Sequence, residues 1–165
     1  MLSYKDFTTH FGSFMTDKDF HSFLTKTFSD LTDYNVLLGD YITSASTGIE
    51  LGFTNNDAIY DDDTQLVFEA GNPIFSYINL WPKSQIIITD FPFNTGFKES
   101  RNEIIHKIGK PTKTNEGYAD FLNKNFLVDN YKIDDLIITF DYDPTEETIN
   151  FIQLRDNNFV EHLKL

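Results

Sequence analysis

The sequence predicts an α+β domain: two N-terminal helices, then a mainly antiparallel, twisted sheet, with one inserted helix near residues 100–109. Apolar residues recur at helical spacing over the first 31 residues, whereas short alternating runs separated by turn residues begin at residue 41. These runs follow one another too closely for the long crossovers that parallel strands need, which favours antiparallel pairing.

The first 31 residues predict two short amphipathic helices. Aromatic side chains in residues 3–14 and apolar side chains in residues 20–31 recur three and four positions apart. Thr16 lies between them as a candidate N-cap, and the acidic residues after it suit the positive end of a helix dipole. We assign both stripes to the core, because Phe is among the residue types most often buried.

The next part of the chain contains five strand candidates, at residues 41–43, 48–53, 66–68, 74–81 and 85–89. Asn55-Asn56-Asp57 marks a turn between two of them. The last run, Gln85-Ile86-Ile87-Ile88-Thr89, is rich in β-branched residues, so we expect a strand that is buried on both faces.

Two local patterns define the second half of the chain. Ser100-Arg101-Asn102-Glu103 has the residues of a capping box, and Gly109 followed by Pro111 predicts the end of that helix. Strands over residues 135–142 and 148–154, joined by a turn at Asp143-Pro144-Thr145, predict a hairpin with a loop of four or five residues. The stretch between the helix and this hairpin is less readable.

Composition places the chain among folded proteins of one domain, which we take to span residues 1–165. Hydrophobic residues make up 40% of the chain, and its seventeen Phe and eight Tyr exclude a disordered or low-complexity sequence. The absence of cysteine excludes disulfides, Cys-ligated zinc and thiol catalysis.

The net charge of −13 is the main indication of function class. So acidic a surface disfavours direct binding to nucleic acid and to anionic membranes, and favours a basic protein partner. The N-terminus lacks the basic and apolar regions of a signal peptide, and uninterrupted apolar stretches reach four residues at most. We therefore expect a cytoplasmic protein.

Residue patterns for catalysis or cofactor binding are missing from the sequence. The four histidines have no zinc-site spacing, the serines lie in no G-x-S-x-G motif, and no glycine-rich loop is placed to bind phosphate. Asp61-Asp62-Asp63 lacks the glycine and the bidentate glutamate of a calcium loop. We expect no enzymatic activity, no cofactor and no metal.

The acidic residues are unevenly distributed. Nine lie between Lys26 and Lys83, where there is no Lys or Arg, and a second group surrounds the C-terminal hairpin. An uneven field of this kind steers a cationic partner during association. The candidate partner-binding residues are Asp57, Asp61, Asp62, Asp63, Glu69, Asp134, Asp135, Asp141 and Asp143.

Several segments between residues 48 and 156 together resemble a family of small bacterial immunity proteins, encoded beside polymorphic toxins that include those of contact-dependent growth inhibition. The segments are GIELGF, NPIFSYINLW, FPFNTGFKESRNEIIHKIGKPTKT, LIITFDYD and TINFIQLRD. The resemblance implies a cytoplasmic protein that binds and neutralises one cognate toxin. It carries over no catalytic residues, and it assigns no contact residues because such interfaces diverge with their toxins.

These observations lead to one favoured hypothesis and two alternatives. We expect stoichiometric inhibition of a basic toxin, with a nuclease as the first choice because a nuclease needs cationic residues to hold phosphates. The toxin would contact the acidic surface or add a strand to a sheet edge. The alternatives are a small-ligand-binding protein or enzyme with an aromatic pocket, and an acidic adaptor such as a phage-type inhibitor of a DNA-binding protein.

Overall fold

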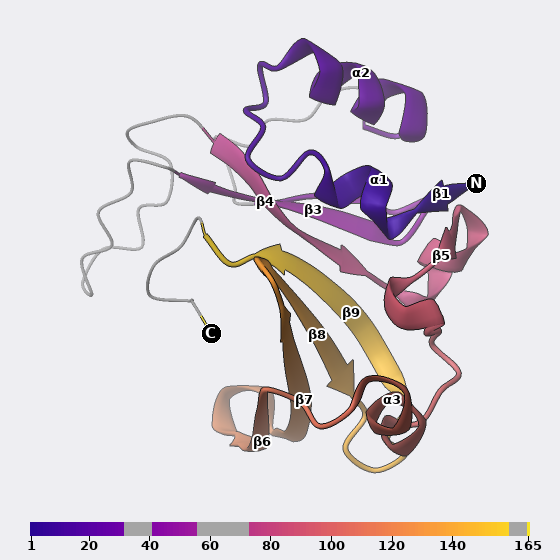
Figure 1. Cartoon of the computed structure of the whole chain (residues 1–165), viewed down its shortest axis with the longest axis vertical. Helices are drawn as coiled ribbons and strands as arrows, with labels where there is room; N and C mark the ends of the chain where they lie inside the picture. The colour runs from indigo at the N-terminus through magenta and orange to yellow at the C-terminus, as the bar shows by residue number, and fades with distance from the viewer. Residues whose placement is uncertain (32–40, 56–72, 159–164) are drawn as a thin grey trace.

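A seven-stranded antiparallel sheet forms the centre of the computed structural model, which describes residues 1–31, 41–55, 73–158 and 165. The strand order is β2-β3-β4-β9-β8-β7-β6. In Figure 1, β3 and β4 run across the view whereas β7, β8 and β9 run down it, so the sheet twists strongly. The strands are β2 (Tyr41–Ser44), β3 (Ile49–Asn55), β4 (Pro73–Leu80), β6 (Lys113–Ala119), β7 (Lys124–Ile133), β8 (Leu136–Tyr142) and β9 (Ile149–Asp156).

Three α-helices among the described residues accompany the sheet, and the predicted α+β class is confirmed. They are α1 (Tyr4–Thr8), α2 (Lys18–Thr27) and α3 (Arg101–Ile108). Figure 1 shows α1 and α2 beside β3 and β4, and α3 at the opposite end of the molecule. A separate two-stranded parallel sheet joins β1 (Leu2–Ser3) to β5 (Ile88–Asp90). Of the helices in the described residues, none is long and apolar enough to cross a bilayer.

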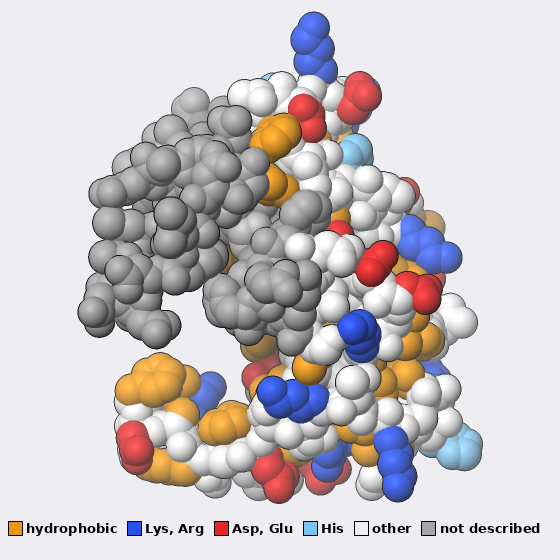
Figure 2. Space-filling model, turned by 60° about the vertical axis from the view of Figure 1, so that its left-hand side comes forward, with side chains coloured by type: hydrophobic (Ala, Val, Ile, Leu, Met, Phe, Trp, Pro, Cys, Tyr) orange, Lys and Arg blue, Asp and Glu red, His pale blue; other side chains and the backbone are white. Residues whose placement is uncertain are grey.

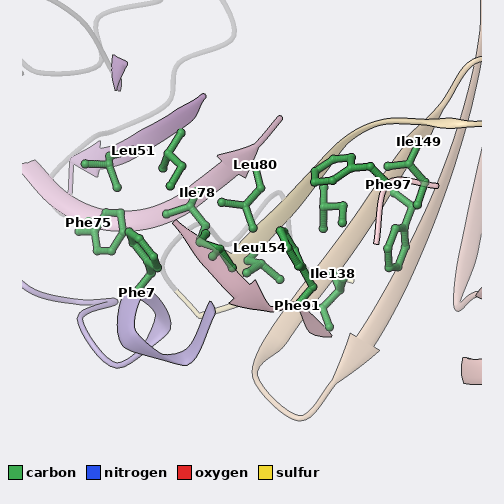
Figure 3. Packing of buried hydrophobic residues seen from close by; sticks show 14 of the residues in the cluster. Phe7, Leu51, Phe75, Ile78, Leu80, Phe91, Phe97, Ile138, Ile149 and Leu154 are labelled. Carbon is green, nitrogen blue, oxygen red and sulfur yellow. The ribbon is translucent and has the colours of Figure 1, made fainter. Parts of the chain in front are cut away.

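One face of the large sheet carries the core. Phe75 and Ile78 of β4, Ile138 of β8 and Leu154 of β9 are almost fully buried on this face. Figure 3 shows them in one layer with Phe7 from α1. Ring pairs such as Phe20–Phe75, with centroids 4.8 Å apart, add aromatic contacts to the burial of apolar area.

On the other face, the ring of Tyr77 lies directly over Gly52 of the neighbouring strand. The register pairs these two residues, and a Cβ atom at position 52 would lie 1.9 Å from the tyrosine ring. Gly52 therefore provides the space that the aromatic ring occupies, and any larger residue there would displace it.

The N-terminal helices are shorter than the sequence predicts. The helix expected over residues 3–14 ends at Thr8, and Gly12 adopts a φ of 91° that stops helical continuation. Beyond it the chain pairs with β4: the Gly12 amide donates to the Phe75 carbonyl at 2.9 Å, and the Phe75 amide donates to the Ser13 carbonyl at 3.0 Å. Sheet pairing replaces the helical hydrogen bonds of this segment.

The strand predicted over residues 85–89 is wrong over most of its length. Pro82 instead begins a short 3₁₀ helix that extends to Ile86, whose side chain is 63% exposed. Only residues from Ile88 form a strand, β5, and it pairs with β1 rather than with the large sheet. The strand candidate at residues 66–68 lies outside the described residues.

The local signals of the second half are confirmed. Ser100 caps α3, accepting from the Glu103 amide while its own amide donates to the Glu103 carboxylate at 2.8 Å. Gly109 follows the helix with a φ of 98°. The predicted hairpin is β8–β9, and the less readable stretch before it forms a second hairpin, β6–β7.

Replacing Phe75 by alanine should lower the free energy of unfolding by about 3–5 kcal/mol, because this fully buried side chain contacts three other rings. Urea denaturation followed by far-UV circular dichroism measures the change. The control Ile86→Ala removes an exposed apolar side chain and should change the same quantity by less than about 0.5 kcal/mol. Equal effects of the two substitutions would contradict the assignment of Phe75 to the core.

Candidate partner-binding surface

The acidic segment that the sequence singles out lies outside the described residues. Asp57, Asp61, Asp62, Asp63 and Glu69 all fall within residues 56–72. Their role as partner-binding residues stays a prediction. The remaining candidates, Asp134, Asp135, Asp141 and Asp143, lie among the described residues.

The C-terminal candidates do not form one patch. Asp134 and Asp135 lie exposed in the turn between β7 and β8, whereas Asp143 begins the turn between β8 and β9. Because β8 has seven residues and a strand rises by about 3.3 Å per residue, the two turns lie about 20 Å apart. From the sequence we expect these acids to form one group around the hairpin. In the structure they lie at opposite ends of β8.

Asp141 and Asp143 are partly committed to local structure. Asp143 accepts hydrogen bonds from the amides of Thr145 and Glu146 at 2.8 and 2.9 Å, which lowers the pKa of its carboxyl group and fixes the turn. Burial raises the pKa of Asp141, whose carboxylate accepts from the Asn150 side chain at 2.8 Å. Both carboxylates therefore have a structural role.

Asp129, which belongs to the same acidic stretch of sequence, is fully buried. Its carboxylate accepts from Arg101 of α3 through Nε at 2.7 Å and through the terminal nitrogen at 3.0 Å, a bidentate ion pair. Thr114 of β6 donates to the same carboxylate at 2.6 Å. The pair fastens the start of α3 to the sheet and removes Asp129 from the surface.

Two tyrosine hydroxyl groups lie near this ion pair without a hydrogen-bond partner among the described residues. They belong to Tyr131 of β7 and Tyr142 of β8, which are 3% and 1% exposed. Burial raises the pKa of Tyr131 to about 12, and it raises the pKa of Tyr142 as well. Both hydroxyl groups are therefore neutral near pH 7 and add no charge to the site.

The face of the sheet opposite the core carries a row of polar residues, which we call the polar row: Glu50, Asn79, Gln153, Thr139 and Asn130. They stand opposite one another on β3, β4, β9, β8 and β7. Asn79 donates to Glu50 at 2.6 Å, Gln153 donates to Asn79 at 2.9 Å, and Thr139 donates to Asn130 at 2.8 Å. Their hydrogen bonds to one another give the row a structural role.

An open depression of about 490 Å³ lies where the chain passes from α1 to α2. Its lining is His10, Ser13, Asp17, Lys18, Asp19 and Phe20. The His10 ring stacks on Phe23 with centroids 4.7 Å apart, so apolar contact holds it in place. This depression is not the aromatic cavity inside the sheet that the small-ligand alternative requires.

Metal ligation finds no support in the part of the chain that the structure describes, where no group of three His, Asp or Glu side chains is placed to hold an ion. His162 lies outside that part.

Few acidic side chains among the described residues belong to ion pairs. Between described residues there are two ion pairs, Arg101–Asp129 and Lys107–Glu99. Asp134, Asp135 and Glu146 belong to neither pair and are exposed. Their charge is therefore directed into solvent, where it acts on an approaching partner.

Comparison with protein-family models, curated proteins and solved structures gave no match.

Replacing Arg101 by methionine should lower the free energy of unfolding by about 3 kcal/mol, because it leaves the Asp129 carboxylate buried without its counter-charge. The control is Lys107→Met, which breaks the more exposed pair with Glu99 and should change stability by less than about 1 kcal/mol. Chemical denaturation at neutral pH measures both. An Arg101→Met protein as stable as the Lys107→Met protein would show that the buried pair is dispensable.

Tyr131 should make the fold sensitive to alkali. Between pH 10 and pH 12 the unfolded chain loses the tyrosine proton while the folded chain keeps it, so the free energy of unfolding falls by about 1.4 kcal/mol per pH unit. Below pH 10 both states are protonated and this contribution is constant. Tyr131→Phe should therefore flatten the pH dependence of stability above pH 10, as measured by urea denaturation at pH 8, 10 and 11. Parallel curves for the two proteins would contradict this assignment.

Proposed function

We propose that this protein is an immunity protein, which binds a cognate cationic toxin domain in a stoichiometric complex and blocks its activity. It acts by occupying a surface of the toxin and catalyses no reaction itself. A nuclease toxin is the favoured target, because such an enzyme must present Lys and Arg to the phosphates of its substrate.

The observation that supports the proposal is the net acidic charge of the chain, together with exposed acids that belong to no ion pair among the described residues. The chain carries −13, and three acids at the β7–β8 and β8–β9 turns are exposed and belong to no ion pair among the described residues: Asp134, Asp135 and Glu146. A negative field of this kind imitates the field of a phosphate backbone and accelerates encounter with a cationic protein. Internal ion pairs would weaken that field.

Division of the acids between two turns fits contact with an extended cationic groove. A groove that holds a nucleic-acid strand is positive along its length, and acids about 20 Å apart at the ends of β8 could contact two parts of it at once. The predicted segment from Asp57 to Glu69 would add a third contact region. Each region contributes to steering, since the field of the whole chain governs long-range attraction.

Co-expression tests the proposal directly. The toxin encoded beside this chain's gene should arrest growth when it is expressed alone. Co-expression of this protein should restore growth, and the two proteins should purify together as a one-to-one complex. Absence of both the complex and the rescue would refute immunity function. A complex without rescue would identify a binding protein that is not an inhibitor.

Charge neutralisation should slow association rather than accelerate dissociation. The triple variant Asp61→Asn/Asp62→Asn/Asp63→Asn should lower the association rate about tenfold at low salt and flatten its salt dependence. The matched variant Asp134→Asn/Asp135→Asn/Glu146→Gln removes the same net charge elsewhere and should have a smaller effect. Stopped-flow association between 20 and 300 mM salt measures both. An unchanged rate for the first variant would remove that segment from the interface.

A further inference from the structure

Three apolar side chains are exposed together at the end of the β6–β7 hairpin. Tyr118, Phe121 and Leu122 are 53%, 88% and 53% exposed, and we call these three residues the hairpin tip. Figure 2 shows hydrophobic side chains projecting at the lower end of the molecule, where Figure 1 places this hairpin. Single exposed apolar residues are normal on protein surfaces, whereas a group of neighbouring ones, including an almost fully exposed Phe, is a candidate interaction site.

The backbone holds the hairpin tip in a defined shape. Residues 120–122 form one turn of 3₁₀ helix, and Asn123 closes it in the left-handed conformation with a φ of 51°. The Asn123 amide donates to the Asp120 carbonyl at 3.2 Å, and the Tyr118 hydroxyl hydrogen bonds to the Asn123 side chain. Because the turn is already ordered, this protein loses little backbone entropy when a partner binds Phe121.

The strand that leads to the tip is an edge of the large sheet. β6 is the last strand in the order, and its residues from Lys113 to Tyr118 are all exposed. An edge strand offers unpaired backbone donors and acceptors to an added strand. The hairpin therefore presents apolar side chains and free backbone hydrogen-bonding groups next to each other.

A second copy of this chain is a poor occupant of this surface. Symmetric antiparallel pairing of two β6 strands about their midpoint would place Glu116 opposite its own equivalent. Each chain also carries −13, so long-range repulsion opposes the encounter of two copies. The net field of the chain attracts a cationic protein, whereas at the hairpin itself the acids Glu116 and Asp120 are balanced by Lys113 and Lys124.

We propose that the hairpin tip is the anchor by which this protein binds a cationic protein partner, with Phe121 and Leu122 entering an apolar pocket of that partner. This inference rests on the proposed function and specifies how the toxin is held. The acidic surface steers the encounter, and the tip provides the short-range contacts that determine how long the complex lasts. A few side chains buried in pockets, often aromatic ones, carry most of the binding energy of an interface.

Site-specific photo-cross-linking in the cells that carry the gene tests the location of the interface. A benzophenone amino acid at position 121 should cross-link to one basic protein, and the same group at position 86 should not. Ile86 is the matched control because it is also exposed and apolar but lies in the 3₁₀ helix before β5. No cross-link at position 121, an equal cross-link at position 86, or a cross-link to a second copy of this chain would overturn the proposal.

The second test measures affinity for the partner that cross-linking identifies, after that partner has been purified separately. Phe121→Ala/Leu122→Ala should weaken binding by about 30-fold or more through faster dissociation, while the Tm stays unchanged because both side chains are exposed. Ile86→Ala should leave affinity unchanged. Wild-type affinity in the double variant would overturn the anchor.

The outcomes separate this inference from the proposed function. If the toxin is neutralised equally well by the double variant, immunity function stands and the anchor is wrong. If the double variant loses a basic partner whose activity the wild-type protein does not inhibit, the anchor stands and immunity function is wrong.

Discussion

Burial of aromatic side chains against one face of a twisted sheet is the interaction on which the other features of this protein depend. Phe20 of α2 packs on Phe53 and Phe75 of the sheet. Phe7 of α1 and Ile104 of α3 belong to the same core. The core face supplies most of this apolar contact, whereas the second face carries the polar row, and Ile137 is buried on that second face too.

Acidic residues in this chain divide into two groups with different roles. Asp129 and Asp143 have structural roles: Asp129 forms a buried ion pair, and Asp143 accepts hydrogen bonds within a turn. Asp134 and Asp135 are exposed and contribute mainly to the external field. Net charge read from the sequence combines the two groups, whereas only the second group is available to a partner.

Sequence patterns predicted the elements whose signals are local and missed those whose signals depend on tertiary context. The capping box at Ser100 and the β8–β9 hairpin need only residues close in sequence, and both were found. The 85–89 run was misassigned because Pro82 and exposure override β-branched propensity. β6 escaped notice because both of its faces are exposed, so it shows no apolar alternation. The distance between Asp135 and Asp143 is set by the length of β8, and counting charges along the sequence takes no account of that length.

The polar row has a consequence for how the strands find their partners. A slip of one residue would turn core side chains to the wrong face, but a slip of two residues would keep every apolar side chain on the core face, so burial alone discriminates poorly against it. Such a slip between β4 and β9 would set Gln153 opposite Tyr77 or Trp81 in place of Asn79 and break the hydrogen bond between the two amides. The polar row thus helps to select the native register, because it destabilises sheets with shifted strands in which the apolar side chains would still be buried.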